Sequence, residues 1–144
     1  VHFIKLRLMN EKGKEVSQNF YWRSNDKYEG RKTLTGPATS GFEALSTLKQ
    51  AKVKASVQGY VQEGREYVKV RVKNTSGVIA FFTQLQLTDE MGTPVRPAFF
   101  TDNFFSLLPG ETREVVVDTK KTDGTQYRIV VKGWNQSRQN ISVK

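Results

Sequence analysis

The sequence contains no cysteine, which excludes a disulfide framework, a thiolate metal site and a cysteine nucleophile. A chain without cysteine fits an oxidising or a reducing compartment equally well, so cysteine usage leaves the compartment open. The one histidine, His2, lies beside the N-terminus, which argues against a histidine-centred triad or a zinc site. From these residue types we expect no metal and no cofactor.

Long apolar runs are also lacking. No segment is long enough to span a bilayer, and the chain does not open with a signal-peptide pattern, so we expect no membrane partner. The sequence starts at Val1 directly in strand-like residues, which is typical of a domain cut from a longer polypeptide. Its 144 residues fit one domain that buries a hydrophobic core without covalent staples.

Acidic residues are too few to balance the basic ones, and the formal charge is +9. Such an excess can mark nucleic-acid binding. Here the basic residues alternate with apolar ones, as in Lys52 and Lys54 and again in Lys69, Arg71 and Lys73. This spacing places them on the solvent face of strands, where lysine also discourages edge-to-edge pairing. We therefore predict no nucleic-acid partner.

Alternation of apolar residues at every second position dominates what is present, and no long amphipathic helix is indicated. The alternating sets are Ile4, Leu6 and Leu8; Val53, Ala55 and Val57; Val68, Val70 and Val72; Ile79, Phe81, Leu85 and Leu87; Val115 and Val117; Tyr127, Ile129 and Val131; and Ile141 and Val143. Turn signals separate them at residues 11–14, 63–64, 74–77, 89–92 and 123–124. Short strands at this spacing predict an all-β protein, and we favour an immunoglobulin-like antiparallel β-sandwich without the usual cysteine pair.

The predicted organisation has three parts. Residues 1–23 form a hairpin, which either ends a preceding β-sandwich domain or pairs into this one. Residues 24–43 are polar and rich in Gly, Ser and Thr, which indicates a linker or an irregular crossing. Residues 44–144 form the immunoglobulin-like sandwich, with a short helical turn or a crossing segment near residues 42–49.

Several local patterns resemble a known family. They are Asn19-Phe20-Tyr21-Trp22, Asn74-Thr75-Ser76, the run from Ile79 to Phe82, the ending Asp102 to Glu111 (DNFFSLLPGE), and Gly133-Trp134-Asn135. In this order, from about Phe3 to Trp134, they resemble the C-terminal part of glycoside hydrolase family 2 enzymes of the β-mannosidase and exo-β-D-glucosaminidase type.

The resemblance implies a bacterial polysaccharide-degrading parent enzyme, periplasmic or secreted, in which β-sandwich domains surround a catalytic (β/α)₈ barrel. The family's catalytic glutamates lie in that barrel, and this sequence has no room for one. The resemblance therefore carries over no catalytic residue. It implies a non-catalytic accessory domain whose partners are the barrel and the preceding sandwich.

Within the chain itself, Asp102 and Glu111 are the one pair of carboxyl groups beside an aromatic-rich segment. Retaining glycosidases need two carboxyl groups a short, fixed distance apart. Glu111 follows Pro-Gly at an expected strand start, which is normally exposed, so we do not assign a catalytic dyad. We expect that this fragment is not an enzyme.

The aromatic residues leave two alternatives open. As a carbohydrate-binding module, the domain would stack sugars on exposed rings and hydrogen-bond them through nearby polar groups. As an accessory domain, it would bury the rings in its core or against a neighbouring domain. The candidates for an interdomain or sugar contact are Tyr21, Trp22, Phe100, Asp102, Asn103, Phe104 and Trp134.

In the run Phe99 to Phe105, the Asp102-Asn103 pair is expected to fix a bend by bonding backbone amides two residues on. Phe99 or Phe100 then turns inward together with Phe105 and Leu107, and Phe104 stays exposed. Three Asn-x-Ser sequons start at Asn74, Asn135 and Asn140. They would accept glycans in a secreted eukaryotic protein, whereas in a bacterial one they are turn-type composition.

Overall fold

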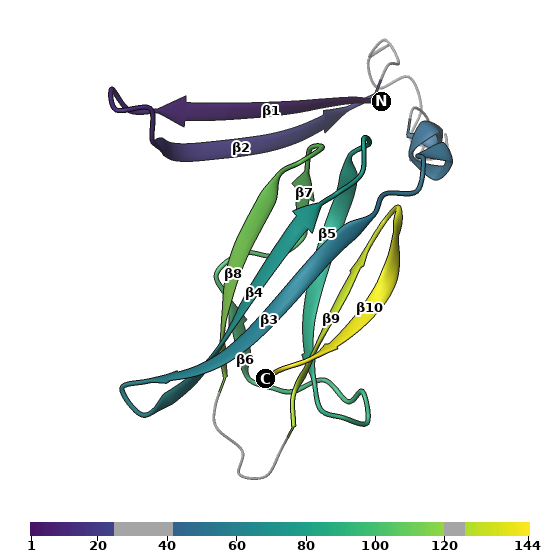
Figure 1. Ribbon diagram of the computed structural model, residues 1–144. Helices are drawn as coiled ribbons and strands as arrows, with labels where there is room; N and C mark the ends of the chain where they lie inside the picture. Colours follow the sequence, from purple (N-terminus) through teal and green to yellow (C-terminus); the bar gives the residue numbers. More distant parts are fainter. Residues whose placement is uncertain (25–41, 120–125) are drawn as a thin grey trace, which may run out of the picture. The chain divides into compact units, whose positions relative to one another are not determined.

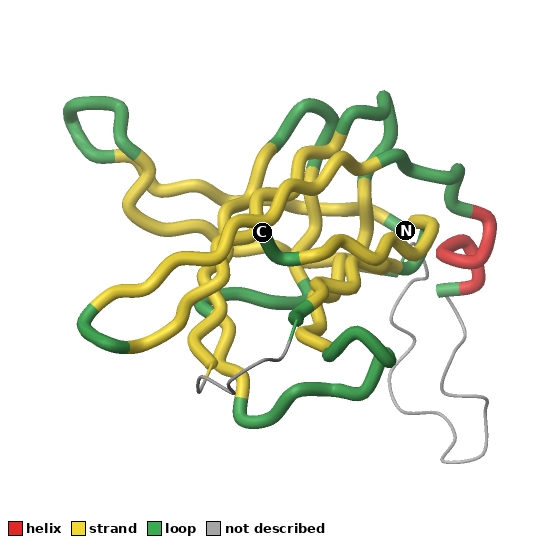
Figure 2. Tube along the Cα trace, turned by 60° about the horizontal axis from the view of Figure 1, so that its bottom comes forward, coloured by secondary structure: helices red, strands yellow, loops and turns green. Residues whose placement is uncertain are grey.

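The computed structural model describes residues 1–24, 42–119 and 126–144. These residues form two compact units, Val1–Leu48 and Lys49–Lys144. Strands account for most of the described residues, as the tube view in Figure 2 shows. Over the described ranges, the one helical segment is a 3₁₀ helix, η1 (Glu43–Thr47), at the predicted helical turn. The expected all-β class is confirmed, whereas the predicted domain boundaries stay a prediction.

The first unit contains an antiparallel hairpin of β1 (His2–Met9) and β2 (Glu15–Arg23). The predicted turn lies between them, and the side-chain oxygen of Asn10 accepts hydrogen bonds from the backbone N–H groups of Lys12 and Lys14. One face of the hairpin carries a row of exposed apolar side chains, namely Ile4, Leu6, Leu8 and Tyr21. This hairpin thus presents apolar surface to solvent.

The second unit is a sandwich of two four-stranded sheets, labelled in Figure 1. One sheet has the order β3-β4-β8-β6 and consists of β3 (Val53–Gln62), β4 (Arg65–Asn74), β8 (Thr112–Thr119) and β6 (Ala98–Phe100). The other has the order β10-β9-β5-β7 and consists of β10 (Gln136–Ser142), β9 (Arg128–Gly133), β5 (Ala80–Thr88) and β7 (Phe105–Leu107). All strand pairs within the two sheets are antiparallel.

The core lies between the two sheets and is built from the predicted alternating residues. Every second side chain of a strand points to the same face, so these residues converge on one interior. The largest fully buried side chains of this core are Leu85, Leu87, Leu107, Ile129, Val68, Val70, Val72, Val115, Val117 and Val131. Ile141 and Val143 pack partly against the core. The immunoglobulin-like sandwich is confirmed, and aliphatic side chains fill its centre.

Most of the turns form where they were predicted. Glu63 and Gly64, between β3 and β4, both have positive φ angles of 50° and 75°, as a two-residue type I′ hairpin turn requires. Asp89 accepts hydrogen bonds from the backbone N–H groups of Met91 and Thr93. The predicted Asp123-Gly124 turn lies outside the described residues. The strand-to-strand geometry is therefore set by local turn chemistry.

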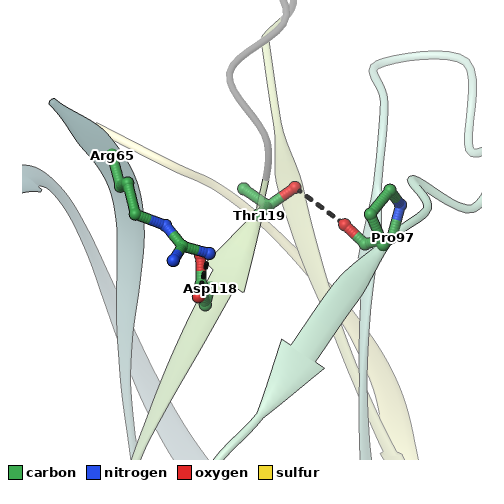
Figure 3. Close-up of polar contacts among 4 residues, drawn as sticks. All are labelled: Arg65, Pro97, Asp118 and Thr119. Atoms are coloured by element: carbon green, nitrogen blue, oxygen red, sulfur yellow. Dashed lines mark hydrogen bonds and ion pairs between the residues drawn. The ribbon is translucent and has the colours of Figure 1, made fainter.

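Figure 3 shows polar contacts that link neighbouring strands at one end of the sandwich. Arg65, at the start of β4, donates a hydrogen bond to Asp118 of β8 over 2.7 Å. The hydroxyl of Thr119 donates to the carbonyl oxygen of Pro97, just before β6, over 3.3 Å. These contacts hold the short edge strand β6 and the β3–β4 hairpin onto β8.

In the described part of the chain, no helix has the length and hydropathy needed to cross a membrane.

Candidate functional site

The aromatic segment from Phe99 to Leu107 passes from one sheet of the sandwich to the other. Phe99 and Phe100 belong to β6, whereas Phe105 and Leu107 belong to β7. Phe99 is 65% exposed, and Phe100 packs partly against the core. Phe105 and Leu107 are buried. The predicted division of the rings is confirmed, with Phe100 as the inward member of its pair.

Asn103 fixes this crossing, although not by the predicted bonds to amides two residues on. Its side-chain oxygen accepts hydrogen bonds from the backbone N–H of Leu85 at 2.8 Å and from that of Phe104 at 3.0 Å. Its side-chain nitrogen donates to the carbonyl oxygen of Leu85 at 3.0 Å. The amide of Asn103 therefore pairs with Leu85 as a backbone peptide would, and extends the edge of the sheet beyond β7.

Asp102 and Glu111, the carboxyl pair tested for catalysis, both have structural partners. Asp102 forms an ion pair with Arg113 over 3.4 Å, and Arg113 also lies over the ring of Phe105. Glu111 accepts a hydrogen bond from the backbone N–H of Leu108 at 2.8 Å, across the Pro-Gly turn. Each carboxylate thus stabilises a turn or a strand of the sandwich.

Strand β5 contains a bulge at Phe81 and Phe82, where its pairing register with β7 shifts. Phe81 is buried, whereas Phe82 is 37% exposed and has a φ angle of 54°. The carbonyl oxygen of Phe81 accepts hydrogen bonds from the backbone N–H of Trp134 and from the side chain of Gln136. These bonds lie on the edge of β5 that pairs with β9, opposite the β7 edge at which the register shifts.

The buried side chain of Asn135 forms hydrogen bonds at the same bulge. Its side-chain oxygen accepts a hydrogen bond from Phe81 N–H at 2.9 Å, and its side-chain nitrogen donates to the carbonyl oxygens of Lys49 and Ile79 at 2.8 Å each. Asn135 is 5% exposed. It therefore joins β5, the start of the sandwich and the β9–β10 turn.

Asn74 has a comparable role between β4 and β7 and is completely buried. Its side chain donates to the carbonyl oxygens of Val78 and Leu107 and accepts two hydrogen bonds from Ser76. Two of the three sequon asparagines, Asn74 and Asn135, are thus internal, whereas Asn140 is exposed. Sequence reasoning assigned Asn74 to a turn and gave neither residue a buried role.

The predicted contact residues differ in exposure and in location. Tyr21, Trp22, Phe104 and Trp134 are between 43% and 58% exposed. Tyr21 and Trp22 belong to the hairpin unit, and the remaining candidates belong to the sandwich. Phe104 contacts Phe82, a residue that was not predicted, at a ring-centroid distance of 5.3 Å. A sugar or interdomain contact by the seven candidates stays a prediction.

Two shallow hollows lie away from these candidates. One of about 450 Å³ is lined by Tyr60, Tyr67, Tyr127 and their neighbours, and one of about 550 Å³ is lined by Lys69, Arg71, Glu114 and others. Lys69 approaches Glu114 to 3.5 Å and lies over the ring of Tyr60. Acidic groups thus interrupt the basic face of this sheet. Over residues 1–24, 42–119 and 126–144, no three His, Asp or Glu side chains group as metal ligands.

Two antiparallel four-stranded sheets packed around an aliphatic core, with polar side chains used on their own backbone, define an immunoglobulin-like β-sandwich module. The sequence model of the exo-β-D-glucosaminidase Ig-fold domain matches residues 33–136, so the chain belongs to that family. The resemblance to family 2 glycoside hydrolases is confirmed.

The relatives are glycosidases. The chain is 31% identical to an exo-β-D-glucosaminidase of Amycolatopsis orientalis and 32% identical to one of Streptomyces avermitilis, over 97% of its length in both cases. It is 28% identical to a mannosylglycoprotein endo-β-mannosidase of Lilium longiflorum over 66% of its length, and it covers 11% of that protein. The crystal structure of the Amycolatopsis orientalis exo-chitosanase CsxA matches 98% of the chain with a TM-score of 0.81 and 31% identity.

The matched region is only a small part of each relative's length. The chain spans 15% and 17% of the two exo-β-D-glucosaminidases and 18% of the exo-chitosanase chain. The family to which the chain belongs is thus one module of much longer glycosidases.

Proposed function

We propose that this chain is a non-catalytic accessory domain of a family 2 glycoside hydrolase of the exo-β-D-glucosaminidase or β-mannosidase type. In this proposal it packs on neighbouring domains of the same polypeptide and stabilises them. The observation that carries the proposal is the unequal coverage, because nearly all of this chain matches but only 15–18% of each exo-acting relative does. A segment so placed within a longer enzyme is a module with neighbours on the same chain.

The chemistry of the described residues supports a structural role. A retaining glycosidase needs two carboxyl groups free to act on a sugar. Here Asp102 is paired with Arg113, and Glu111 accepts a hydrogen bond from its own turn. These side chains stabilise the sandwich, and catalysis falls to the part of the parent polypeptide outside this chain.

We also propose that the β1–β2 hairpin belongs to the preceding β-sandwich domain of the parent. The family model begins at residue 33, whereas the relatives match almost the whole chain, including the hairpin. A two-stranded hairpin is only marginally stable by itself. Its exposed row of Ile4, Leu6, Leu8 and Tyr21 is what a strand pair presents when it contributes to the core of a larger sheet.

Deleting residues 49–144 from the full-length parent polypeptide tests the main proposal. We expect the thermal midpoint of the remaining enzyme to fall by about 5 °C or more, because the contacts of one domain on its neighbours are lost. At low temperature the truncated enzyme should keep its kcat, because no catalytic group has been removed. The full-length Asn140→Ala variant, altered at one exposed position, serves as the control. Loss of kcat with an unchanged midpoint would contradict the proposal.

The second candidate function is a carbohydrate-binding module, which the exposure of Trp134 (58%) and Phe104 (48%) favours. The positive charge of the chain argues against a carbohydrate-binding role toward one class of sugar, the glucosamine polymers. A formal charge of +9 repels glucosamine polymers, whose amino groups are themselves protonated. Phenylalanine also offers a sugar hydroxyl no hydrogen bond.

Titration of the 144-residue chain with glucosamine and mannose oligosaccharides separates the two functions. We expect no saturable binding in isothermal calorimetry, because Asn103 and Asn135 beside the rings are bonded to the backbone and Asp102 is paired with Arg113. Trp134→Ala is compared with Phe99→Ala, which removes a ring of similar exposure (65% against 58%) from β6. Saturable binding that Trp134→Ala abolishes and Phe99→Ala preserves would favour the carbohydrate-binding module.

A further inference from the structure

Phe82 and Phe104 form a pair of exposed aromatic rings in mutual contact. Their ring centroids are 5.3 Å apart with an interplanar angle of 45°, and their side chains are 37% and 48% exposed. Phe82 lies at the bulge of β5, and Phe104 ends the crossing segment that leads into β7. Segments far apart in the sequence thus bring two large apolar rings to one place on the surface.

Both residues hold a backbone conformation that phenylalanine rarely adopts. The φ angles of Phe82 and Phe104 are 54° and 56°, in the left-handed region where a bulky side chain clashes with its own backbone. Glycine adopts this region without steric cost. Of the five other described positions with positive φ, four are glycine, namely Gly13, Gly64, Gly92 and Gly110, and the fifth, Glu63, lies in the β3–β4 hairpin turn. Two aromatic rings kept where glycine would remove the strain indicate that the rings themselves have a use.

The surrounding structure imposes this conformation. The backbone N–H of Phe82 donates to the hydroxyl of Ser106 at 3.1 Å, and that of Phe104 donates to the side-chain oxygen of Asn103. Asn135 holds the neighbouring residue, Phe81, through its backbone N–H. The polar groups beside the two rings are therefore used on the backbone, and the chemistry left to the surface is apolar.

We propose that Phe82 and Phe104 form the contact by which this domain packs on an apolar surface of a neighbouring domain in the same polypeptide. The inference rests on the proposed function and locates its contact. More than four fifths of the length of each exo-acting relative lies outside the match, so neighbouring domains are at hand. The chain enters the sandwich next to this bulge, where Lys49 and Ala51 are both hydrogen-bonded to Asn135. At the other end of the sandwich sequence, the carbonyl oxygen of Lys144 accepts a hydrogen bond from the backbone N–H of Gly59 in β3.

The test compares the double variant Phe82→Gly, Phe104→Gly in two settings, the full-length parent and the 144-residue chain. Glycine removes the rings and relieves the left-handed strain, so the sandwich itself should not weaken. In the 144-residue chain we expect a thermal midpoint within about 3 °C of the unchanged chain, or above it. In the full-length parent we expect at least half of the fall in midpoint that deletion of residues 49–144 produces. Phe99→Ala, which removes an exposed ring from extended backbone, should change neither midpoint.

The outcomes distinguish this inference from the function on which it rests. If the deletion lowers the midpoint of the parent and the double variant does not, the domain packs through another face and the inference fails alone. An equal fall in the 144-residue chain would mean that the rings only stabilise the sandwich. A dimer of the 144-residue chain in sedimentation experiments, lost in the double variant, would mean that a second copy covers the rings. Either of these results overturns the inference. If deletion of residues 49–144 leaves the thermal midpoint of the parent unchanged, the proposed function itself is refuted, and the inference fails with it.

Discussion

Replacing Asn135 with alanine should lower the free energy of unfolding of the 144-residue chain by about 3–5 kcal/mol, because buried backbone groups lose their partners. The Asn135 side chain bonds Phe81 N–H and the carbonyl oxygens of Ile79 and Lys49. A buried donor or acceptor left unsatisfied costs about 1–3 kcal/mol. The loss also removes the support of the β5 bulge, so the cost is not confined to one bond.

Urea unfolding followed by circular dichroism measures this effect, and the midpoint should fall while the slope stays unchanged. The matched control is Asn140→Ala in the same hairpin. Asn140 is exposed and accepts one long hydrogen bond, 3.3 Å, from Arg138, so its replacement should stay within about 0.5 kcal/mol. A loss below about 1 kcal/mol for Asn135→Ala would contradict the account of the bulge given by these bonds.

Replacing Leu107 with alanine should cost about 3–5 kcal/mol, because it leaves a cavity in the centre of the sandwich. Leu107 is 1% exposed and belongs to the core cluster that both sheets share. It is the last residue of the edge strand β7. Thermal and urea unfolding of the 144-residue chain should show the same loss.

The neighbouring residue provides the control for this prediction. Leu108 is only half-buried, so Leu108→Ala should cost about 1 kcal/mol in lost burial of apolar area. If the two variants lost equal stability, the assignment of Leu107 to the core and Leu108 to the rim would be wrong. The pair thus compares the last residue of β7, which is buried, with the residue that follows the strand.

The strands could be predicted because their signal is local. Val68, Val70 and Val72 alternate with charged residues, and this pattern alone assigns them to the inner face of β4, where they are 2% exposed or less. The division of the rings, with Phe99 or Phe100 and Phe105 inward and Phe104 exposed, was predicted from a bend at Asp102-Asn103, although Asn103 forms other bonds than those expected. Resemblance to a family supplied the rest of the architecture.

The side-chain bonds to distant backbone could not be predicted in this way. Asn103 bonds to Leu85, and Asn135 bonds to Lys49, so each partner lies 18 to 86 residues away in the sequence. An asparagine that pairs with a distant strand has the same local composition as one in a solvent-exposed turn. The bulge at Phe82 was missed for a related reason, because a register shift against β7 depends on tertiary pairing and not on the alternation within β5.

The burial of two sequon asparagines has a consequence for production of the protein. In the secretory pathway of a eukaryotic host, oligosaccharide is transferred to Asn-x-Ser while the chain is still unfolded. A glycan on Asn74 or Asn135 would then have to fit where the structure leaves no solvent, so the modified chain could not close its sandwich. Ser137 is exposed and its hydroxyl accepts one hydrogen bond at the surface, from Gln50 at 3.2 Å, so Ser137→Ala removes the acceptor motif at Asn135 without touching the buried amide. Ser76 offers no such freedom, because its hydroxyl bonds the side chain of Asn74.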